Sequence, residues 1–327
     1  MFTLNKEKNK DFVVLNIGDP QIDNELWGPD NISSLETVKL TLGEIVPKVK
    51  PDMITITGDL ADEYGRDLYE AIISYVDSFG VPWAPVMGNH DHEDGCDPFV
   101  IAEMLAEAEH CIFEVGDPSM GCGHYTVVIE EDGRPITAFI MMDSHHRIEM
   151  TDENGNYRRA VVPLSEAQYK WYEEHIISLR SIGCEDSVLV NHFPLYEYKL
   201  AWNAAIKPDV DLSRVHGWDP EAKSIWREEY ADSIGINYEP VEPEVEESRH
   251  FEIVHRLGHT KNILCAHDHG NGSSIVYRGI RLTYSLKTGT GGYFMRQNGC
   301  AVITVGDSGV KNIRYEYVDV TKLRNSK

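Results

Sequence analysis

Polar residues that can bind metals or transfer protons stand directly after apolar runs at five places in the chain. These five motifs are Asp19-Pro20-Gln21, Gly58-Asp59, Gly88-Asn89-His90-Asp91, Asn191-His192-Phe193-Pro194 and Ala266-His267-Asp268-His269. Each motif alone is a weak signal, because Gly-Asp after a strand is common and a lone histidine in a loop is more often structural. Together they supply carboxylate, amide and imidazole donors, a mixture that suits a pair of borderline divalent metals such as Mn²⁺, Fe²⁺ or Zn²⁺. The histidines argue against an all-oxygen Ca²⁺ or Mg²⁺ site.

The first three motifs lie in a half of the chain that alternates strands with helices. Apolar, β-rich runs predict strands at 12–17, 53–57 and 83–87, each ending at a motif. Apolar residues recur near helical spacing from about Ser33 to Pro51, where a serine can cap the start and the proline stops the helix. A second helix is expected at 67–78. This alternation predicts a parallel sheet whose functional residues sit at the carboxyl ends of the strands.

The second half of the chain is richer in strands. We expect one long helix at 165–179, capped by Ser165, and two packed sheets with outer helices. Strands are expected at 125–129, 135–142, 187–190, 262–265, 274–277, 281–285, 301–305 and 312–317. The acidic, proline-punctuated stretch 238–247 is predicted to be an exposed loop. Because no linker divides the chain, we expect a single domain over 1–327 with an irregular inserted loop region at about 202–248.

Composition restricts the class of partner and the compartment. The 327 residues include 30 Lys and Arg against 54 Asp and Glu, a formal charge of −24 that disfavours general nucleic-acid binding. The 6 cysteines form no CxxC pair, which excludes a zinc ribbon and a thioredoxin-type motif. The first residues lack the apolar region of a secretory signal, and no run reaches the roughly 18 apolar residues of a membrane span. We therefore expect a cytoplasmic protein that binds no membrane.

The order, spacing and identity of the five motifs resemble those of the calcineurin-like metallophosphoesterases. That family's pattern runs D-x-H, GD, GNH[DE], H and GHxH, and the resemblance spans roughly residues 12–305. The purple-acid-phosphatase-like branch that lacks the purple tyrosine looks most similar. The shared stretches are 191–198, 266–271, 289–293 and Met142-Asp143-Ser144 followed by Gln168 and Trp171. The resemblance implies an α/β fold, a four-layer α/β/β/α sandwich of two packed mixed sheets flanked by helices.

The resemblance also implies a dinuclear metal centre whose two ions share Asp59. The first ion would be held by Asp19, Gln21, Asp59 and His269. The second would be held by Asp59, Asn89, His192 and His267. It further implies a metal-bridging hydroxide as nucleophile and His90 as the group that protonates the leaving oxygen, with Asp91 as a carboxylate that orients His90.

Three positions depart from the family's pattern. Gln21 replaces the histidine of the first motif and offers a weaker, neutral ligand atom. Ala266 replaces the first glycine of the last motif, a small change. Asp62 stands where a purple, tyrosinate-ligated ferric site would need tyrosine, so we do not expect that chromophore.

A glycine-rich segment, Gly289-Thr290-Gly291-Gly292, is expected to form a conformationally permissive loop. It lacks the lysine of a P-loop and the serine or threonine that follows that lysine. We therefore favour tight packing beside the metal centre over a phosphate cradle.

The function indicated by the motifs is that of a metal-dependent hydrolase of phosphoric esters. A phosphomonoesterase leads, and the alternative is a phosphodiesterase or nucleotide pyrophosphatase, encouraged by the D-x-Q form of the first motif. A nuclease is disfavoured by the net charge. A non-catalytic metal-binding docking module ranks low, because such a protein would have lost ligands, whereas every position here holds a plausible donor. The implied partner is a phosphate-ester substrate, and the sequence leaves protein partners open.

Overall fold

The computed structural model describes residues 1–28, 31–63, 65–93, 95–151, 155, 157–243, 249–293 and 297–325. Two large sheets form its centre. The 5-stranded sheet has the order β17 (Gly309–Asp319), β16 (Gln297–Gly306), β2 (Phe12–Ile17), β5 (Met53–Ile56) and β6 (Trp83–Pro85). The 8-stranded sheet has the order β1 (Phe2–Asn5), β7 (Tyr125–Glu131), β8 (Arg134–Met141), β11 (Ser187–Val190), β13 (Thr260–Cys265), β15 (Ile280–Tyr284), β14 (Asn271–Tyr277) and β12 (Ile234–Asn237).

Both sheets are mixed, and each contains a run of parallel strands. In the smaller sheet β2, β5 and β6 are parallel, and in the larger sheet β8, β11, β13 and β15 are parallel. Parallel strands end at the same edge of a sheet, so the loops that follow them are brought together.

Alternating side chains of the strands separate the core into layers. Val14 and Met53 point between the sheets, where they pack with Phe139 and Val188 of the larger sheet. Leu15 and Ile54, the next residues along the same strands, instead face the helices on the outside. These outer helices of the smaller sheet are α1 (Ser34–Val49), α2 (Arg66–Asp77) and α3 (Pro98–Glu107).

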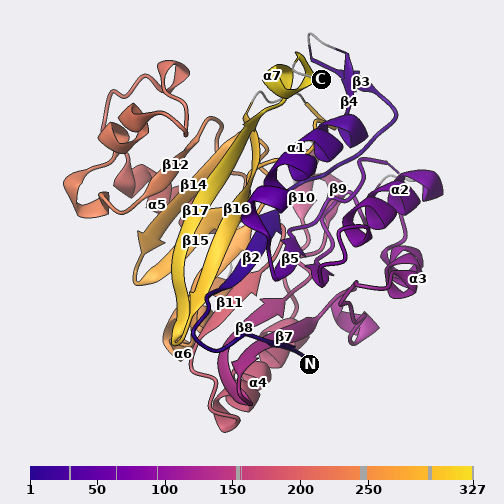
Figure 1. The fold of residues 1–327 in the computed structure, drawn as a ribbon, viewed down its shortest axis with the longest axis vertical. Helices are drawn as coiled ribbons and strands as arrows, with labels where there is room; N and C mark the ends of the chain where they lie inside the picture. Colours follow the sequence, from indigo (N-terminus) through magenta and orange to yellow (C-terminus); the bar gives the residue numbers. More distant parts are fainter. Residues whose placement is uncertain are drawn as a thin grey trace.

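The outer face of the larger sheet is covered in the same way. Its strands pack against α4 (Glu166–Ser181), α5 (Tyr196–Ala205) and α6 (His250–Leu257), with Tyr172 and Phe251 among the buried side chains. Figure 1 shows the two helical groups on either side of the strands, with α1 lying across β2 and β16. The order helices, sheet, sheet, helices confirms the predicted four-layer sandwich.

Local signals explain where the best-predicted helices begin. The Ser33 hydroxyl accepts a hydrogen bond from the Glu36 backbone N–H at 3.1 Å, which caps α1. Ser165 and Gln168 form a capping box at the start of α4. Both capped helices begin within one residue of the predicted position.

Several elements are absent from the prediction. These are α3, α5, α6, α7 (Val320–Asn325), β1, β12, the hairpin of β9 (Arg147–Thr151) and β10 (Tyr157–Val161), and the short pair β3 (Leu26–Trp27) and β4 (Ile32–Ser33). The region expected to be irregular contains three 3₁₀ turns at 212–214, 220–225 and 228–230, and β12, which joins the edge of the larger sheet. Part of the acidic stretch, 244–248, lies outside the described residues.

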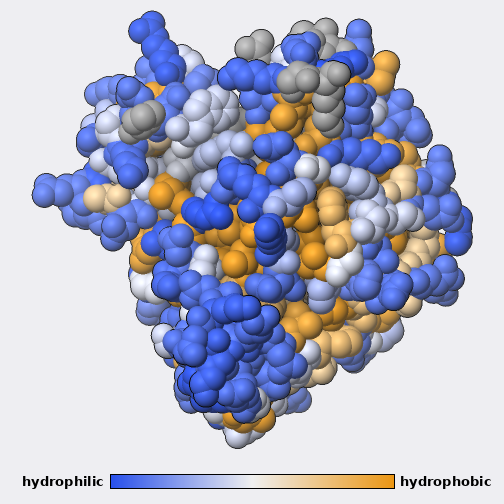
Figure 2. All heavy atoms as spheres, viewed as in Figure 1, coloured by the Kyte–Doolittle hydropathy of each residue, from blue (hydrophilic) through white to orange (hydrophobic). Residues whose placement is uncertain are grey.

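The surface is largely hydrophilic, as expected from the acidic composition. Hydrophilic residues cover most of the face seen in Figure 2, with hydrophobic residues gathered toward its middle. Among the helices of the described part of the chain, none combines the length and apolar content needed to cross a bilayer.

Candidate metal centre

Loops that leave the carboxyl ends of five strands meet at one place between the two sheets. The smaller sheet contributes the loops after β2, β5 and β6, and the larger sheet contributes those after β11 and β13. Six of the seven side chains expected to bind metal come together there with at most 8% of their surface exposed, namely Asp19, Asp59, Asn89, His192, His267 and His269. The seventh, Gln21, is also buried and lies at the edge of this group.

The backbone at this place is held in an uncommon conformation. Asp19, Asp59 and His267 have φ angles of 41°, 51° and 74°, in the left-handed region that non-glycine residues rarely occupy. Strain of this kind persists only where the surrounding structure fixes it, and it gathers at functional sites. Gly88 is needed for the close approach, because a Cβ there would collide with Asp59 Oδ1.

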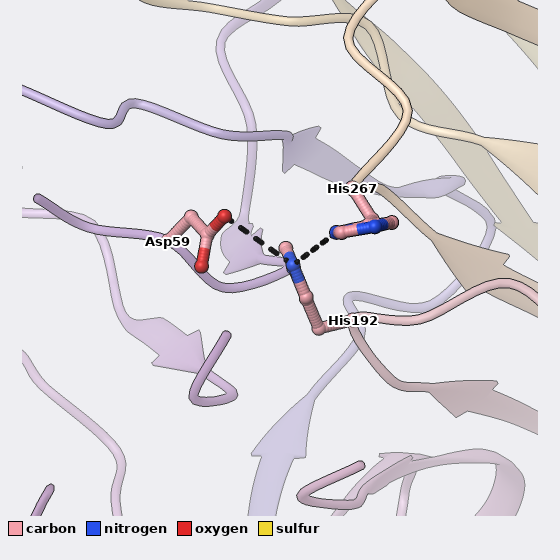
Figure 3. A group of neighbouring side chains, drawn as sticks. All are labelled: Asp59, His192 and His267. Carbon is pink, nitrogen blue, oxygen red and sulfur yellow. Dashed lines mark hydrogen bonds and ion pairs between the residues drawn. The ribbon is translucent and has the colours of Figure 1, made fainter. Parts of the chain in front are cut away.

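Acceptor atoms converge on one nitrogen of His192. Its Nδ1 lies 2.8 Å from the Thr57 carbonyl oxygen, so Nδ1 carries the proton and donates it. Its Nε2 then faces Asn89 Oδ1 at 3.0 Å, Asp59 Oδ2 at 3.3 Å and His267 Nδ1 at 3.3 Å. Figure 3 shows His192 between Asp59 and His267, all three pointing toward one another. The Asp59 and Asn89 oxygens and His192 Nε2 repel one another in this buried place unless a proton or a metal cation lies among them.

A second group of acceptors shares Asp59 with the first. One ligand atom each from Asp19, Asp59 and His269 lies within 4.8 Å of the others, as also holds for Asp59, His192 and His267. Asp19 Oδ2 and His269 Nδ1 are both buried without a hydrogen-bond partner. Buried polar atoms without partners are costly, so each of them calls for an explanation. The donor set of both groups therefore fits metal cations, with Asp59 between them.

Burial and neighbouring charges set the protonation of the group. Burial would lower the pKa of His192, but the Asp59 carboxylate outweighs it and raises the pKa to about 9. Burial lowers the pKa of His267 to about 4 and that of His269 well below its ordinary value, and it raises the pKa of Asp19. Two neutral histidines beside buried carboxylates are what metal binding requires.

Gln21 is bonded at both ends of its amide. Its Nε2 donates to Asp62 Oδ1 at 2.6 Å, and its Oε1 accepts from Lys287 Nζ at 2.9 Å. Lys287 is 1% exposed and comes from the loop after β15, the next strand of the larger sheet. Burial lowers the pKa of Lys287 to about 8, against the pull of the Asp19 and Asp59 carboxylates.

His90 stands at the edge of the group, where Nδ1 lies 3.0 Å from the Asp62 carbonyl oxygen. Burial would lower the pKa of His90, but the carboxylates of Asp59 and Asp62 raise it. The expected orienting contact from Asp91 is replaced by this contact from Asp62. Asp91 instead accepts hydrogen bonds from the Gly88 and Leu60 backbone N–H groups and the Tyr69 hydroxyl, so it fixes the loop that carries Asn89.

A cavity of about 450 Å³ opens onto the centre. It is lined by Asp59, His90, His267 and His269 from the centre, and by further residues that include Arg147, Glu239, Glu242 and Tyr293. Arg147 lies at the start of β9, and its Nη2 is 2.5 Å from His267 Nε2 and 3.1 Å from Glu242 Oε2.

The glycine-rich segment packs against the first motif, as favoured from the sequence. A Cβ at Gly289 would collide with the Pro20 carbonyl oxygen, and one at Gly291 would collide with the Gln21 carbonyl oxygen. The segment therefore holds Asp19 and Gln21 in place through its backbone.

Sequence reasoning missed three residues of this site, namely Asp62, Arg147 and Lys287. Lys287 had a usable signal, because it follows a predicted strand directly, as the five motifs do. Asp62 stands out in the sequence only as the position of a missing tyrosine. Arg147 had no local signal, because its place depends on the unpredicted β9–β10 hairpin.

Known proteins are similar to this chain in sequence and in fold. In sequence it is 22% identical over 277 residues to a protein of Arabidopsis thaliana named "Probable inactive purple acid phosphatase 28", a match that covers 77% of this chain and 62% of that protein. This chain thus spans less than two thirds of that relative. In fold it resembles a dimetal phosphatase from Danio rerio (TM-score 0.58, 12% identity, 94% of this chain and 99% of that one). A 5'-nucleotidase precursor from Thermus thermophilus is a more distant neighbour (TM-score 0.47, 11% identity, 97% of this chain and 57% of that one).

A family model agrees with the motifs from which the site was built. The model described as calcineurin-like phosphoesterase matches residues 12–271, a range that contains all the grouped carboxylates, amides and histidines. The chain belongs to the calcineurin-like phosphoesterase family.

Proposed function

We propose that this protein is a metal-dependent phosphoric ester hydrolase, and within that class a phosphomonoesterase. The observation that carries the proposal is the convergence of Asp59, Asn89 and His267 on Nε2 of His192. Such a group is stable when a cation lies within it. The second group, formed by Asp19, Asp59 and His269, supports a dinuclear centre bridged by Asp59.

The mixed carboxylate, amide and imidazole donors favour Mn²⁺, Fe²⁺ or Zn²⁺. When bound, the ions would supply Lewis acidity, which activates water near neutral pH and offsets charge on the phosphoryl oxygens. Asp59 would be the ligand that the two ions share. The Thr57 carbonyl keeps the proton of His192 on Nδ1, so Nε2 remains a ligand atom.

In this proposal His90 donates the proton that the leaving group needs. The Asp62 carbonyl holds its Nδ1–H, which orients the ring at the wall of the cavity. Nε2 is then the nitrogen that delivers a proton to the leaving oxygen of the ester. The raised pKa of His90 keeps this proton available near neutral pH.

Arg147 is the arginine among the described residues that line the cavity, and we assign it to the substrate phosphate. Its guanidinium already contacts His267, so it lies beside the position where the phosphoryl group would bind. An arginine fork matches the geometry of phosphate oxygens. The cavity volume suits a small molecule.

Acidic residues around the same cavity disfavour a nucleic-acid substrate. Asp62, Glu239 and Glu242 line it, and the chain carries a net charge of −24. A polyanionic backbone would be repelled there.

The six cysteines are all free, which supports the expected location in the reducing cytoplasm.

The test is a screen of purified protein loaded with Mn²⁺, Fe²⁺, Zn²⁺ or Mg²⁺. We expect turnover of aryl phosphate monoesters to exceed that of the matching diesters, and to stop after chelation. Faster diester hydrolysis would favour the phosphodiesterase or pyrophosphatase alternative. Stoichiometric metal binding with no turnover of any ester would favour the docking module and overturn the proposed function.

A further inference from the structure

Lys287 lies on the Asp19 side of the centre and cannot leave it without breaking backbone contacts. Lys287 pairs with Gly18 in a parallel bridge, and the Thr288 N–H donates to the Gly18 carbonyl at 2.8 Å. The Gly289 N–H donates to the Asp19 carbonyl at 3.3 Å. The segment that carries the lysine is thus fastened to the segment that carries the first predicted ligand.

The lysine also occupies the atom through which Gln21 would bind a metal. An ammonium group can only donate, so the atom it meets at 2.9 Å must be the carbonyl oxygen Oε1 of Gln21. Asp62 accepts from the other end of the amide at 2.6 Å, which fixes the same orientation independently. Gln21 therefore holds Lys287 in this arrangement.

The positive charge of Lys287 acts on the acidic groups around the metal position formed by Asp19, Asp59 and His269. The carboxylates of Asp19, Asp59 and Asp62 attract it, and Lys287 in turn acts on Asp19 and His269. These electrostatic interactions involve all three members of the Asp19, Asp59 and His269 group. The second group surrounds His192, on the other side of Asp59.

We propose that Lys287 is a resident cation of the Asp19 side and makes the two metal positions unequal. The position formed by Asp59, Asn89, His192 and His267 binds its ion tightly. The position formed by Asp19, Asp59 and His269 binds its ion more weakly, because a fixed positive charge repels the incoming cation and because Gln21 is withheld as a ligand. The inference rests on the metal binding proposed above, and it does not depend on which ester is the substrate.

The pairing with Lys287 accounts for the glutamine at position 21, where the family's first motif has a histidine. A neutral histidine at position 21 would have one donor and one acceptor nitrogen, so once its acceptor bound a metal it would have none left for Lys287. Glutamine has an acceptor for the lysine and a donor for the aspartate in one amide. The Gln21 and Lys287 side chains are therefore interpreted as a pair.

The test is calorimetric titration of the metal-free protein with Mn²⁺, checked by metal content after gel filtration. Wild type should bind two ions in separate steps, the second at least about tenfold weaker than the first. Lys287→Met should tighten the weak step by about tenfold or more and change the tight step less. Lys311→Met, which removes a surface lysine paired with Asp11, is the matched control and should leave both steps unchanged.

A second variant keeps the test decisive if Lys287→Met fails to fold. Gln21→Ala should not weaken either step, because the amide is not a ligand while Lys287 is bound to it. Equal affinities in wild type, an unchanged difference in Lys287→Met, or a weaker step in Gln21→Ala would each overturn the inference. Failure to bind any Mn²⁺ would instead contradict the metal binding on which the proposed function depends.

Discussion

His192 donates its Nδ1 proton to the carbonyl oxygen of Thr57 at 2.8 Å, and this one hydrogen bond determines what the other nitrogen can do. Thr57 directly follows β5 and stands two residues before Asp59. The strand that delivers the shared carboxylate therefore also sets the tautomer of the histidine opposite. In metal sites this kind of support fixes the ring and raises the basicity of the ligand nitrogen.

Replacement of Asp59 by asparagine tests the shared ligand. The amide keeps the size of the side chain and an oxygen that can accept the His90 backbone N–H, now 2.9 Å from Asp59 Oδ1. It loses the negative charge that two cations would share. We expect metal-dependent hydrolysis to fall by about a hundredfold or more.

Circular dichroism should show that the Asp59→Asn protein keeps its fold. Asp11→Asn is the control, because Asp11 is a surface carboxylate paired with Lys311. Wild-type turnover in Asp59→Asn would rule out Asp59 as the bridging ligand.

Replacement of His90 by alanine separates proton donation from metal binding. His90 contacts Asp62 and lines the cavity, and it is outside both groups of ligand atoms. We expect kcat to fall by about 100-fold or more on an alkyl phosphate, and less on an aryl phosphate whose leaving group needs no proton. Metal content, measured by elemental analysis, should stay at the wild-type level. Equal losses of kcat on both substrates would contradict a proton-donating role.

Arg147 is predicted to act on substrate affinity. Arg147→Met removes the guanidinium while keeping an unbranched side chain over Phe193, which the guanidinium now faces at 6.0 Å. We expect KM for a phosphate monoester to rise by about tenfold or more. Arg147→Lys should recover part of this loss, because it restores the charge without the fork. Steady-state kinetics that leave KM unchanged in Arg147→Met would place the phosphate elsewhere.

The stability of the metal-free protein should depend on pH through His192. Its pKa is raised to about 9 from 6.5, so the folded state holds its proton more tightly than the unfolded state does. The stabilisation is therefore complete below pH 6.5 and is lost as the pH rises toward 9. Lys287 acts in the opposite direction only from about pH 8 upward, because burial lowers its pKa to about 8.

Burial lowers the pKa of His267 and His269, so these two groups oppose the His192 effect near pH 6.5, where they take up protons only in the unfolded state. The useful interval is thus about pH 7.5 to 8. The Tm of protein kept in a chelator should fall across it, as followed by circular dichroism. Saturation with Mn²⁺ should reduce the slope, because a ligated His192 no longer takes up a proton. A Tm that rises with pH in the chelated protein would contradict the electrostatics of this site.

The sequence predicted the strands that carry the ligands because their signals are local. The runs before Asp59 and His192 are short, apolar and rich in β-branched residues, and they end at polar motifs. The meeting of Asp19 and His267 is implied by the resemblance to the calcineurin-like pattern and not by strand order, because their strands belong to different sheets. The Asp19 carboxylate does accept a hydrogen bond from the His267 N–H at 3.2 Å, across 248 positions of sequence.

What the sequence could not provide is the set of contacts that depends on packing between distant segments. The partner of His90 is a carbonyl oxygen, which every residue has, so nothing distinguishes Asp62 in advance. Lys287 follows a predicted strand, but its contact with Gln21 depends on the pairing of its loop with Gly18, which the sequence does not show. The edge strand β12 was missed because its pairing with β14, and not a strong pattern of its own, makes it a strand.

Anomalous X-ray diffraction at the manganese edge, from crystals soaked in Mn²⁺, tests the central claim most directly. We predict a strong peak enclosed by Asp59, Asn89, His192 and His267, and a weaker one enclosed by Asp19, Asp59 and His269. Crystals that keep this arrangement of side chains at saturating Mn²⁺ but show no peak between Asp59 and His192 would contradict the claim that these residues form a metal centre.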